Sequence, residues 1–238
     1  MRRIVKGLPP ACLQDFIQAQ QQIEPEPVNL TYRDFPAKAE LRKALTAEQF
    51  GLCGYTGSGV DDSRISRLAA SDGKTVFLNH VEHLKSQRTC RDELEAAGHQ
   101  FGRDLGQDLD YANVIAALEV RGAEKEQFGA SIKAALALPV LPTQVDCEQR
   151  FQYREDGVVE GLDDHAATTI ARLLLNHDTL QGWRQRALQI WLDPQVVQSA
   201  NDLRDVIAAV SLPRDGTLPE FAFVIEAVAR SYLGETDL

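Results

Sequence analysis

The stretch from Asn79 to Asn113 constrains this chain more than any other part of its sequence. It begins N-H-V-E-H-L-K-S-Q, with two histidines and a glutamate within four residues, and it ends D-L-D-Y-A-N-V-I. No other stretch concentrates imidazole, carboxylate and amide groups in this way. We therefore take His80, Glu82, His83 and Asn113 as the first candidates for a functional site.

Around this stretch, the pattern predicts a mainly α protein with short β-hairpins, an α+β fold class. Spaced apolar residues indicate helices at residues 11–22, 36–51, 90–97, 111–138, 164–192, 196–210 and 218–233. Extended segments are expected at residues 1–8, as an edge strand, and at T-V-F-L, as a strand leading into the histidines. Glycines at residues 51–59 indicate a tight hairpin or knuckle, and Asp156-Gly157 indicates the turn of another hairpin within residues 147–161.

The proline-flanked segment L-P-V-L-P indicates a soft domain boundary near residue 142. It divides the chain into residues 1–142, with the N-terminal helices and the histidine-rich stretch, and residues 143–238, with a hairpin and helices. A chain of 238 residues can form two small domains or one large one. We therefore keep open that the two parts pack as a single domain.

The formal net charge of −10 and a pI near 5.0 argue against a general nucleic-acid coat protein. Binding to a phosphate backbone needs clustered lysine and arginine. A nuclease is not excluded, because local patches matter more than the total charge. The charge does suggest that a partner supplies part of the contacts with a nucleic acid.

The sequence also predicts a cytoplasmic protein without a membrane partner. No apolar run approaches the roughly 20 residues that span a bilayer. The basic N-terminus lacks the apolar segment of a signal peptide. Four cysteines lie far apart without a C-x-x-C pair, so we expect free thiols, mostly in the core. They are Cys12, Cys53, Cys90 and Cys147.

The residue types at the start of the stretch suit phosphodiester hydrolysis, which needs an activated water and a divalent ion on the scissile phosphate. His83 is a candidate general base because its ordinary pKa lies close to neutral pH. Glu82 can offer an oxygen ligand to a hard cation, and Asn113 can hold the histidine in its productive tautomer. The alternative, also open, is that His80 and His83 form a solvated pair that binds nothing.

Several segments together resemble the HNH-nuclease family that includes the PtuB-type subunits of Septu and retron-linked antiphage systems. A-E-L-R-K-A-L-T-A-E-Q-F-G-L-C-G-Y is similar to the family's helix running into its first cysteine pair. H-V-E-H-L-K-S-Q resembles its I-E-H-x-x-P-K-S segment, and D-Y-A-N-V-I resembles D-W-x-N-L. D-C-E-Q-R-F-Q-Y-R-E-D-G-V-V and T-I-A-R-L-L-L-N-H-D-T-L-Q-G-W-R resemble its C-terminal hairpin and helix.

The resemblance implies a ββα-metal core embedded in helices, in which a hairpin presents the base and the following helix adds a metal-side residue. His83 then corresponds to the base, Glu82 to its acidic neighbour and Asn113 to the central asparagine, with His80 as a companion histidine. The metal would be Mg²⁺ or Mn²⁺, held by Glu82, His80 and a third residue. The third position falls near a glycine, and Glu124 is among the nearest substitutes.

The chain departs from the family pattern at the structural zinc. The partner of Cys53 is Thr56, a poor zinc ligand, and R-G-A-E-K stands where the second cysteine pair is expected. Structural zinc is therefore expected to be absent, and packing has to replace it.

Five cations of the sequence are candidates for contact with nucleic acid. Lys85, Arg121 and Lys125 lie near the quoted motifs, and we predict that they bind the phosphate backbone. Arg184 and Arg186 either contact phosphate or form the solvated side of their helix.

Two functions follow from the resemblance. The first is a metal-dependent HNH endonuclease subunit of an antiviral defence complex, which hydrolyses DNA or RNA. Its implied partner is an ABC-type, SMC-like ATPase, joined in some systems by a retron reverse transcriptase and its RNA–DNA product. The alternative is a catalytically degenerate HNH domain that serves as an adaptor for the ATPase.

Overall fold

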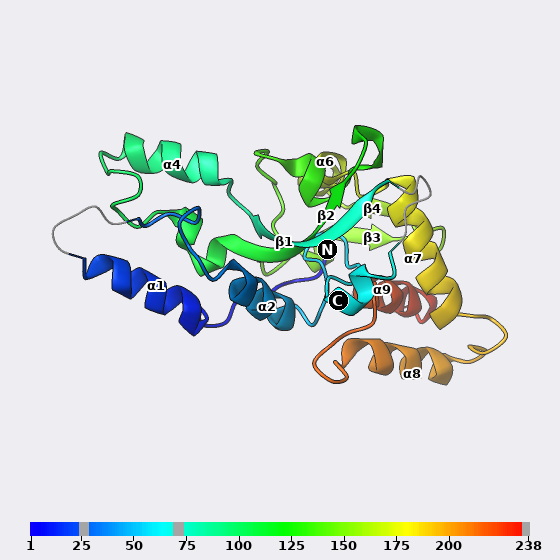
Figure 1. Cartoon of the computed structure of the whole chain (residues 1–238). Coiled ribbons are helices and arrows are strands. Elements are labelled where there is room, and N and C mark those ends of the chain that lie inside the picture. Colours follow the sequence, from blue (N-terminus) through cyan, green and yellow to red (C-terminus); the bar gives the residue numbers. More distant parts are fainter. Residues whose placement is uncertain (24–28, 69–73, 235–238) are drawn as a thin grey trace.

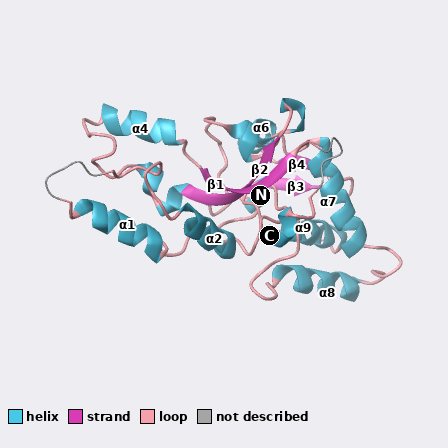
Figure 2. Cartoon of the chain, in the orientation of Figure 1, coloured by secondary structure: helices cyan, strands magenta, loops and turns pink. Residues whose placement is uncertain are grey.

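The computed structural model describes residues 1–23, 29–68 and 74–234. Its helices are α1 (Ala11–Gln21), α2 (Lys38–Glu48), α3 (Asp62–Ile65), α4 (Gln87–Ala96), α5 (Ala130–Lys133), α6 (Asp164–Leu173), α7 (Asp178–Trp191), α8 (Ala200–Ser211) and α9 (Ala222–Tyr232). Its strands are β1 (Val76–His83), β2 (Val114–Arg121), β3 (Phe151–Tyr153) and β4 (Val159–Gly161). The two antiparallel pairs are β1–β2 and β3–β4 (Figure 2). The predicted fold class, mainly α with short β-hairpins, is confirmed.

The β1–β2 ribbon runs across the middle of the molecule (Figure 1). Helices α1, α2 and α4 lie towards one end, and α6 to α9 gather at the other. β1 is longer than the predicted T-V-F-L strand, because it continues through His83. The two histidines and the glutamate of the opening motif are therefore strand residues.

The predicted helix at residues 111–120 is wrong, because Tyr111–Asn113 forms only a 3₁₀ turn and the apolar run after it forms β2. All but one of the residues from Val114 to Val120 are buried. A continuous apolar run is typical of a strand covered on both faces, and periodicity alone does not separate it from a buried helix. The outer edge of β2 is completed by the Gln49 side chain, whose amide exchanges hydrogen bonds of 2.7 and 2.8 Å with the Ala116 backbone. This tertiary partner bonds the edge of β2 that no strand among the described residues covers.

The predicted helical continuation through residues 121–138 is also wrong. Only a 3₁₀ turn at Glu124–Glu126 and the single turn of α5 form there. Gly129 stands before α5 with φ +63°, which breaks a continuous helix. A Cβ atom at Gly122 would lie 2.5 Å from Thr75 Oγ1, so the backbone at this position packs closely against the Thr75 side chain.

The predicted long helix over 164–192 is two helices, α6 and α7. Leu174 ends α6 in the left-handed region, with φ 47°. Asn176 then bonds both the backbone N–H and the C=O of Val159 at 2.9 Å, which holds the chain against β4. His177 caps α7 by accepting from Thr179 N. The break is set by this long-range contact with the hairpin.

Residues 1–8 form no strand, which corrects the predicted edge strand. Ile4 N donates to Pro142 O at 2.7 Å, and Gly7 N donates to Glu48 Oε1 at 2.8 Å. The Lys6 ammonium pairs with the same Glu48 carboxylate at 2.5 Å. The segment is therefore extended but held by scattered partners rather than by a ladder.

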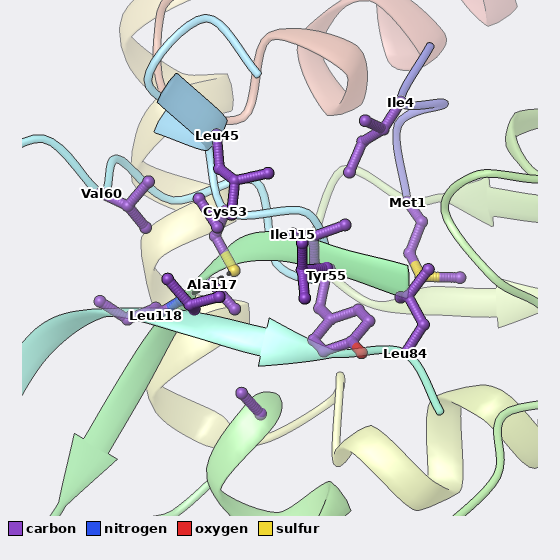
Figure 3. Packing of buried hydrophobic residues seen from close by; sticks show 14 of the residues in the cluster. Met1, Ile4, Leu45, Cys53, Tyr55, Val60, Leu84, Ile115, Ala117 and Leu118 are labelled. Carbon is purple, nitrogen blue, oxygen red and sulfur yellow. Dashed lines mark hydrogen bonds between the residues drawn. The ribbon is translucent and has the colours of Figure 1, made fainter. Parts of the chain in front are cut away.

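One hydrophobic cluster joins both sides of residue 142, since it includes buried residues from Met1 to Leu180. Met1, Ile4, Tyr55 and Ile115 pack beside the ribbon (Figure 3). A smaller cluster lies under α7 to α9 and includes Leu188, Leu218 and Ile225. Among the described helices, none has the length and apolar character to span a bilayer.

The glycine-rich segment at residues 51–59 forms the predicted tight hairpin. Cys53 N donates to Ser58 O at 2.8 Å, and a bridge joins Leu52 to Gly59. Cys53 Sγ accepts from Leu118 N at 3.2 Å, while Thr56 and Ser58 bond through their hydroxyls at 2.7 Å. Hydrogen bonds thus close this turn. All four cysteines are free thiols and three of them are buried, as predicted.

Candidate functional site

The β1–β2 register separates the predicted site residues onto two faces of the ribbon. His83 lies opposite Val114, Glu82 opposite Ile115 and His80 opposite Ala117. Because successive strand residues point to opposite faces, His80 and Glu82 share one face and His83 lies on the other. We call these the Glu82 face and the His83 face of β1.

On the Glu82 face, the Glu82 carboxylate is almost fully buried and has three partners. Its Oε1 lies 2.8 Å from Lys133 Nζ and 3.5 Å from the Tyr55 hydroxyl. Its Oε2 lies 3.6 Å from His80 Nε2, and the other nitrogen of that ring is 3.9 Å from Glu119 Oε2. The result is a polar network that runs from the core to the half-exposed His80.

Lys133 is the decisive member of this network. Its side chain is 1 % exposed, and its ammonium also donates to His83 O at 2.8 Å. Lys133 comes from α5, the helix that follows the β1–β2 hairpin. The resemblance led us to expect that this helix brings the third metal-side residue. Here it brings a positive charge against the carboxylate that would hold the ion.

The residues present therefore do not fit a divalent cation. A metal at Glu82 Oε1 would have to share the oxygen with an ammonium already at hydrogen-bond distance, and like charges this close repel. In residues 1–23, 29–68 and 74–234, no group of three or more His, Cys, Asp or Glu side chains is arranged to hold a metal ion. Glu124 lies beyond Arg121, whose strand partner is Val76 at the opposite end of the ribbon from Glu82.

On the His83 face, the imidazole is enclosed and neutral. His83 is 5 % exposed, and its Nε2 lies 3.0 Å from the carbonyl oxygen of Asp108. The Tyr32 ring packs edge-on at 4.5 Å between ring centroids, and the Gln87 amide lies 3.5 Å from Nδ1. Burial lowers the pKa of His83 to about 4, despite the opposing effects of the Asp108 carbonyl and Glu82.

This environment disfavours general-base chemistry at His83. A carbonyl only accepts, so Nε2 carries the proton and the lone pair is on Nδ1, facing Gln87. A base has to reach a water, and its pKa works best near the operating pH. A ring with a pKa of about 4 is a weak proton acceptor at neutral pH.

Asn113 organises the backbone rather than the imidazole. Its Oδ1 accepts from Lys85 N at 2.8 Å, and its Nδ2 donates to Lys85 O at 3.1 Å and to Gln107 O at 3.0 Å. Leu84 N donates to Asn113 O at 2.8 Å. These bonds tie together the two ends of the long connection between β1 and β2. The His83 ring is instead bonded by the backbone carbonyl of Asp108.

The cations predicted to bind nucleic acid do not form one patch. Lys85 Nζ bonds the Glu93 carboxylate and, at 2.8 Å, Gln107 Oε1. At the other end of the ribbon, Arg121 makes a two-pronged contact of 2.9 and 3.1 Å with Glu119. Lys125 lies 3.8 Å from Glu126.

Neither alternative for Arg184 holds, since this residue is buried. It is 2 % exposed and donates to Gly157 O at 2.6 Å and to Leu175 O at 2.7 Å. Arg186 is on the solvated side of α7.

Sequence reasoning missed Lys133, Asp108 and Tyr32. One signal for Lys133 was present, because a single lysine interrupts the apolar run in A-S-I-K-A-A-L-A-L. A lone charge on a buried segment indicates a buried partner. Asp108 acts through its backbone, which no side-chain pattern reveals. No protein-family model matches the chain, and no curated protein shows significant similarity to it.

Proposed function

We propose that this chain is a non-catalytic, HNH-like subunit that works by binding a partner protein. The observation that carries the proposal is the buried contact of 2.8 Å between Lys133 Nζ and Glu82 Oε1. An ammonium neutralises the carboxylate as a metal would, but it holds no water and generates no hydroxide. The strand alternation that separates His83 from Glu82 supports the same conclusion.

A groove between α7, α8 and α9 supports a binding role. It encloses about 930 Å³ and has an apolar floor. Its charged lining residues are Glu155 and Asp193, with no lysine or arginine among the lining residues. This charge is complementary to an apolar segment flanked by basic residues. The apolar floor consists of Leu188, Leu192, Val197, Leu203, Val228 and Leu233.

The proposed occupant is such a segment of an ABC-type, SMC-like ATPase, the partner class that the family resemblance implies. In systems with a retron, the reverse transcriptase and its RNA–DNA product would join the same assembly. The chain would then contribute contacts rather than bond cleavage.

The second candidate is the metal-dependent nuclease. One observation favours it. Strand β1 ends in Glu82-His83, and just beyond it Asn113 hydrogen-bonds Lys85, which joins the two ends of the long connection between β1 and β2. This arrangement agrees with what the resemblance implies. The two candidates differ in whether His83 is needed for any activity.

The experiment uses the full chain, alone and co-expressed with such an ATPase from the same genome. Cleavage of DNA and RNA is measured with Mg²⁺ or Mn²⁺ for the wild type and for His83→Ala. We expect no cleavage by either protein and unchanged co-purification of the ATPase. Cleavage by the wild type that disappears in His83→Ala would refute the proposal and establish the nuclease.

Partner binding is tested separately with Leu203→Glu, which places a negative charge in the groove. The matched control is Leu212→Glu, at an exposed position at the end of the same helix and outside the groove lining. We expect Leu203→Glu to lose the ATPase and Leu212→Glu to retain it. Equal retention by both variants would remove the groove from the proposal.

A further inference from the structure

A small cavity lies between the N-terminal segment and the glycine-rich hairpin, in a part of the molecule that the candidate site does not use. Its volume is about 220 Å³, and we call it the Arg2 cavity. Residues 2–5 line one side of it, and residues 48–50 and 52–54 line the other. Pockets that hold drug-sized molecules measure roughly 300–1,000 Å³, so the Arg2 cavity suits a smaller molecule.

Most of the wall of the Arg2 cavity is apolar. One of its residues, Phe50, has φ 54°, a left-handed conformation that is uncommon for an aromatic residue. Leu218 N donates to Phe50 O at 3.0 Å and holds the backbone in this conformation. Strained residues that the surrounding structure holds in place are frequent at ligand sites. The apolar wall consists of Ile4, Val5, Phe50, Leu52, Cys53 and Gly54, of which Ile4 and Cys53 are labelled in Figure 3.

The guanidinium of Arg2 is a charged group of this cavity without a partner of opposite charge. Within the described residues it forms neither a hydrogen bond nor an ion pair, and it lies 5.2 Å from the centroid of the Phe50 ring. Arg2 is half-buried, and burial lowers its pKa against the opposing effects of Glu148 and Glu226. A desolvated cation of this kind gains free energy when an anion binds to it.

The carboxylates that line the Arg2 cavity or act on Arg2 already have partners. Glu48 is the acidic residue of the lining, and it accepts from Gly7 N at 2.8 Å in addition to its ion pair. The three carboxylates and their partners are Glu48 with Lys6 Nζ at 2.5 Å, Glu148 with Arg3 N at 2.8 Å and Glu226 with Arg230 at 2.8 Å. The guanidinium of Arg2 is therefore available to an anion that enters the cavity.

We infer that the Arg2 cavity binds a small monocarboxylate with an aromatic or branched apolar body. A guanidinium presents a planar pair of donors that matches the two oxygens of a carboxylate. The apolar wall, with the ring of Phe50, takes the body of the same molecule out of water. Acetate lacks such a body, and nucleotides and lipids exceed the volume of the cavity. The inference does not rest on the proposed partner or on any cleavage.

The experiment titrates the full chain with benzoate and measures binding by saturation-transfer NMR. We expect benzoate to bind with a Kd below about 1 mM, which is reasonable for a ligand of this size. Benzamide has the same shape without the charge, and acetate has the charge without the ring. Each of the two should bind at least about tenfold more weakly, because each makes only one of the two kinds of contact.

Arg2→Gln removes the charge and should weaken benzoate binding at least about tenfold. The matched control is Arg186→Gln, which removes an exposed cation on α7 and should bind as the wild type does. If Arg2→Gln unfolds, Arg2→Lys takes its place. That variant keeps the charge but loses the two-pronged geometry, so it should still bind benzoate more weakly than the wild type.

Four results would overturn the inference. The first is the absence of saturable benzoate binding to the wild type up to about 10 mM, well above the expected Kd. The second is binding of benzamide or acetate that equals that of benzoate. The third is an equal loss of binding in the Arg2 and Arg186 variants. The fourth is tighter binding of phenyl phosphate than of benzoate, which would assign the cavity to phosphate esters.

Discussion

The two faces of β1 bury their polar groups in opposite protonation states, although Glu82 and His83 are neighbours in the chain. Glu82 is buried as a charge, and Lys133 provides the opposite charge at 2.8 Å. His83 is buried as a neutral ring, against a carbonyl and an aromatic side chain. A carboxylate in an apolar interior needs a partner, whereas an imidazole can lose its proton instead.

This difference bears directly on chemistry. A metal-assisted base requires the ion and the imidazole to act on one water. In this protein the Glu82 carboxylate is paired with the Lys133 ammonium, and the His83 imidazole is hydrogen-bonded to the backbone. Under the proposed function, the two faces contribute to stability rather than to a shared reaction centre.

The largest expected effect comes from removing the charge that satisfies the Glu82 face. Lys133→Met leaves the Glu82 carboxylate buried without its partner, so we expect the free energy of unfolding to fall by about 3–5 kcal/mol. The double variant Lys133→Met/Glu82→Gln has no unpaired charge and should recover at least half of that loss. Urea denaturation measures both. An equal loss in the single and double variants would show that packing, and not charge, holds this face.

Acidification should reveal how the burial of His83 affects the stability of the protein. The folded pKa of about 4 lies below the unfolded value of 6.5, so between these pH values the unfolded chain binds the additional proton. This lowers stability as the pH falls from 6.5 towards 4, by up to about 3 kcal/mol, with no effect above pH 7. Burial raises the pKa of Asp108, which acts in the opposite direction at lower pH.

Denaturation of the wild type and His83→Gln across this pH range measures the effect of His83. His83→Gln should lose less stability on acidification than the wild type. His165→Gln, at an exposed position on α6, is the matched control and should follow the wild type. Parallel curves for the wild type and His83→Gln would mean that the imidazole is accessible to solvent in the folded protein.

The smallest effect is expected at the edge of the Glu82 face. The His80 side chain is 43 % exposed and lies 3.6 and 3.9 Å from its two carboxylates. Contacts of this kind near the surface contribute little, so His80→Ala should change the free energy of unfolding by no more than about 0.5 kcal/mol. A loss comparable to that of Lys133→Met would show that the whole network acts as one unit.

Local patterns predicted much of the fold. The helices α1, α2 and α9 lie within predicted segments and α8 ends one residue beyond its own, because their apolar spacing and flanking prolines act over a few residues. The β3–β4 hairpin has Gly157 at φ 82°, a backbone conformation that glycine adopts without strain. Two of the errors fall on β2 and on the break between α6 and α7. Both depend on distant partners, Gln49 for β2 and Val159 for the break.

The candidate site, like the fold, could be predicted from the sequence only in part. Its residue types, and the adjacency of Glu82 to His83, can be read directly from the chain. Strand alternation then assigns them to opposite faces once β1 is known to include both. The approach of Lys133, fifty residues later, cannot be read from any local spacing.

The sequence alone was sufficient for the mainly helical class, the two hairpin turns, the free cysteines and the concentration of polar groups between Asn79 and Asn113. These follow from short-range propensities or directly from which residues occur and how they are spaced. The partners of those polar groups were established only by the three-dimensional packing. A buried carboxylate is satisfied by whichever charge the fold brings within a few ångströms, and α5 brings an ammonium.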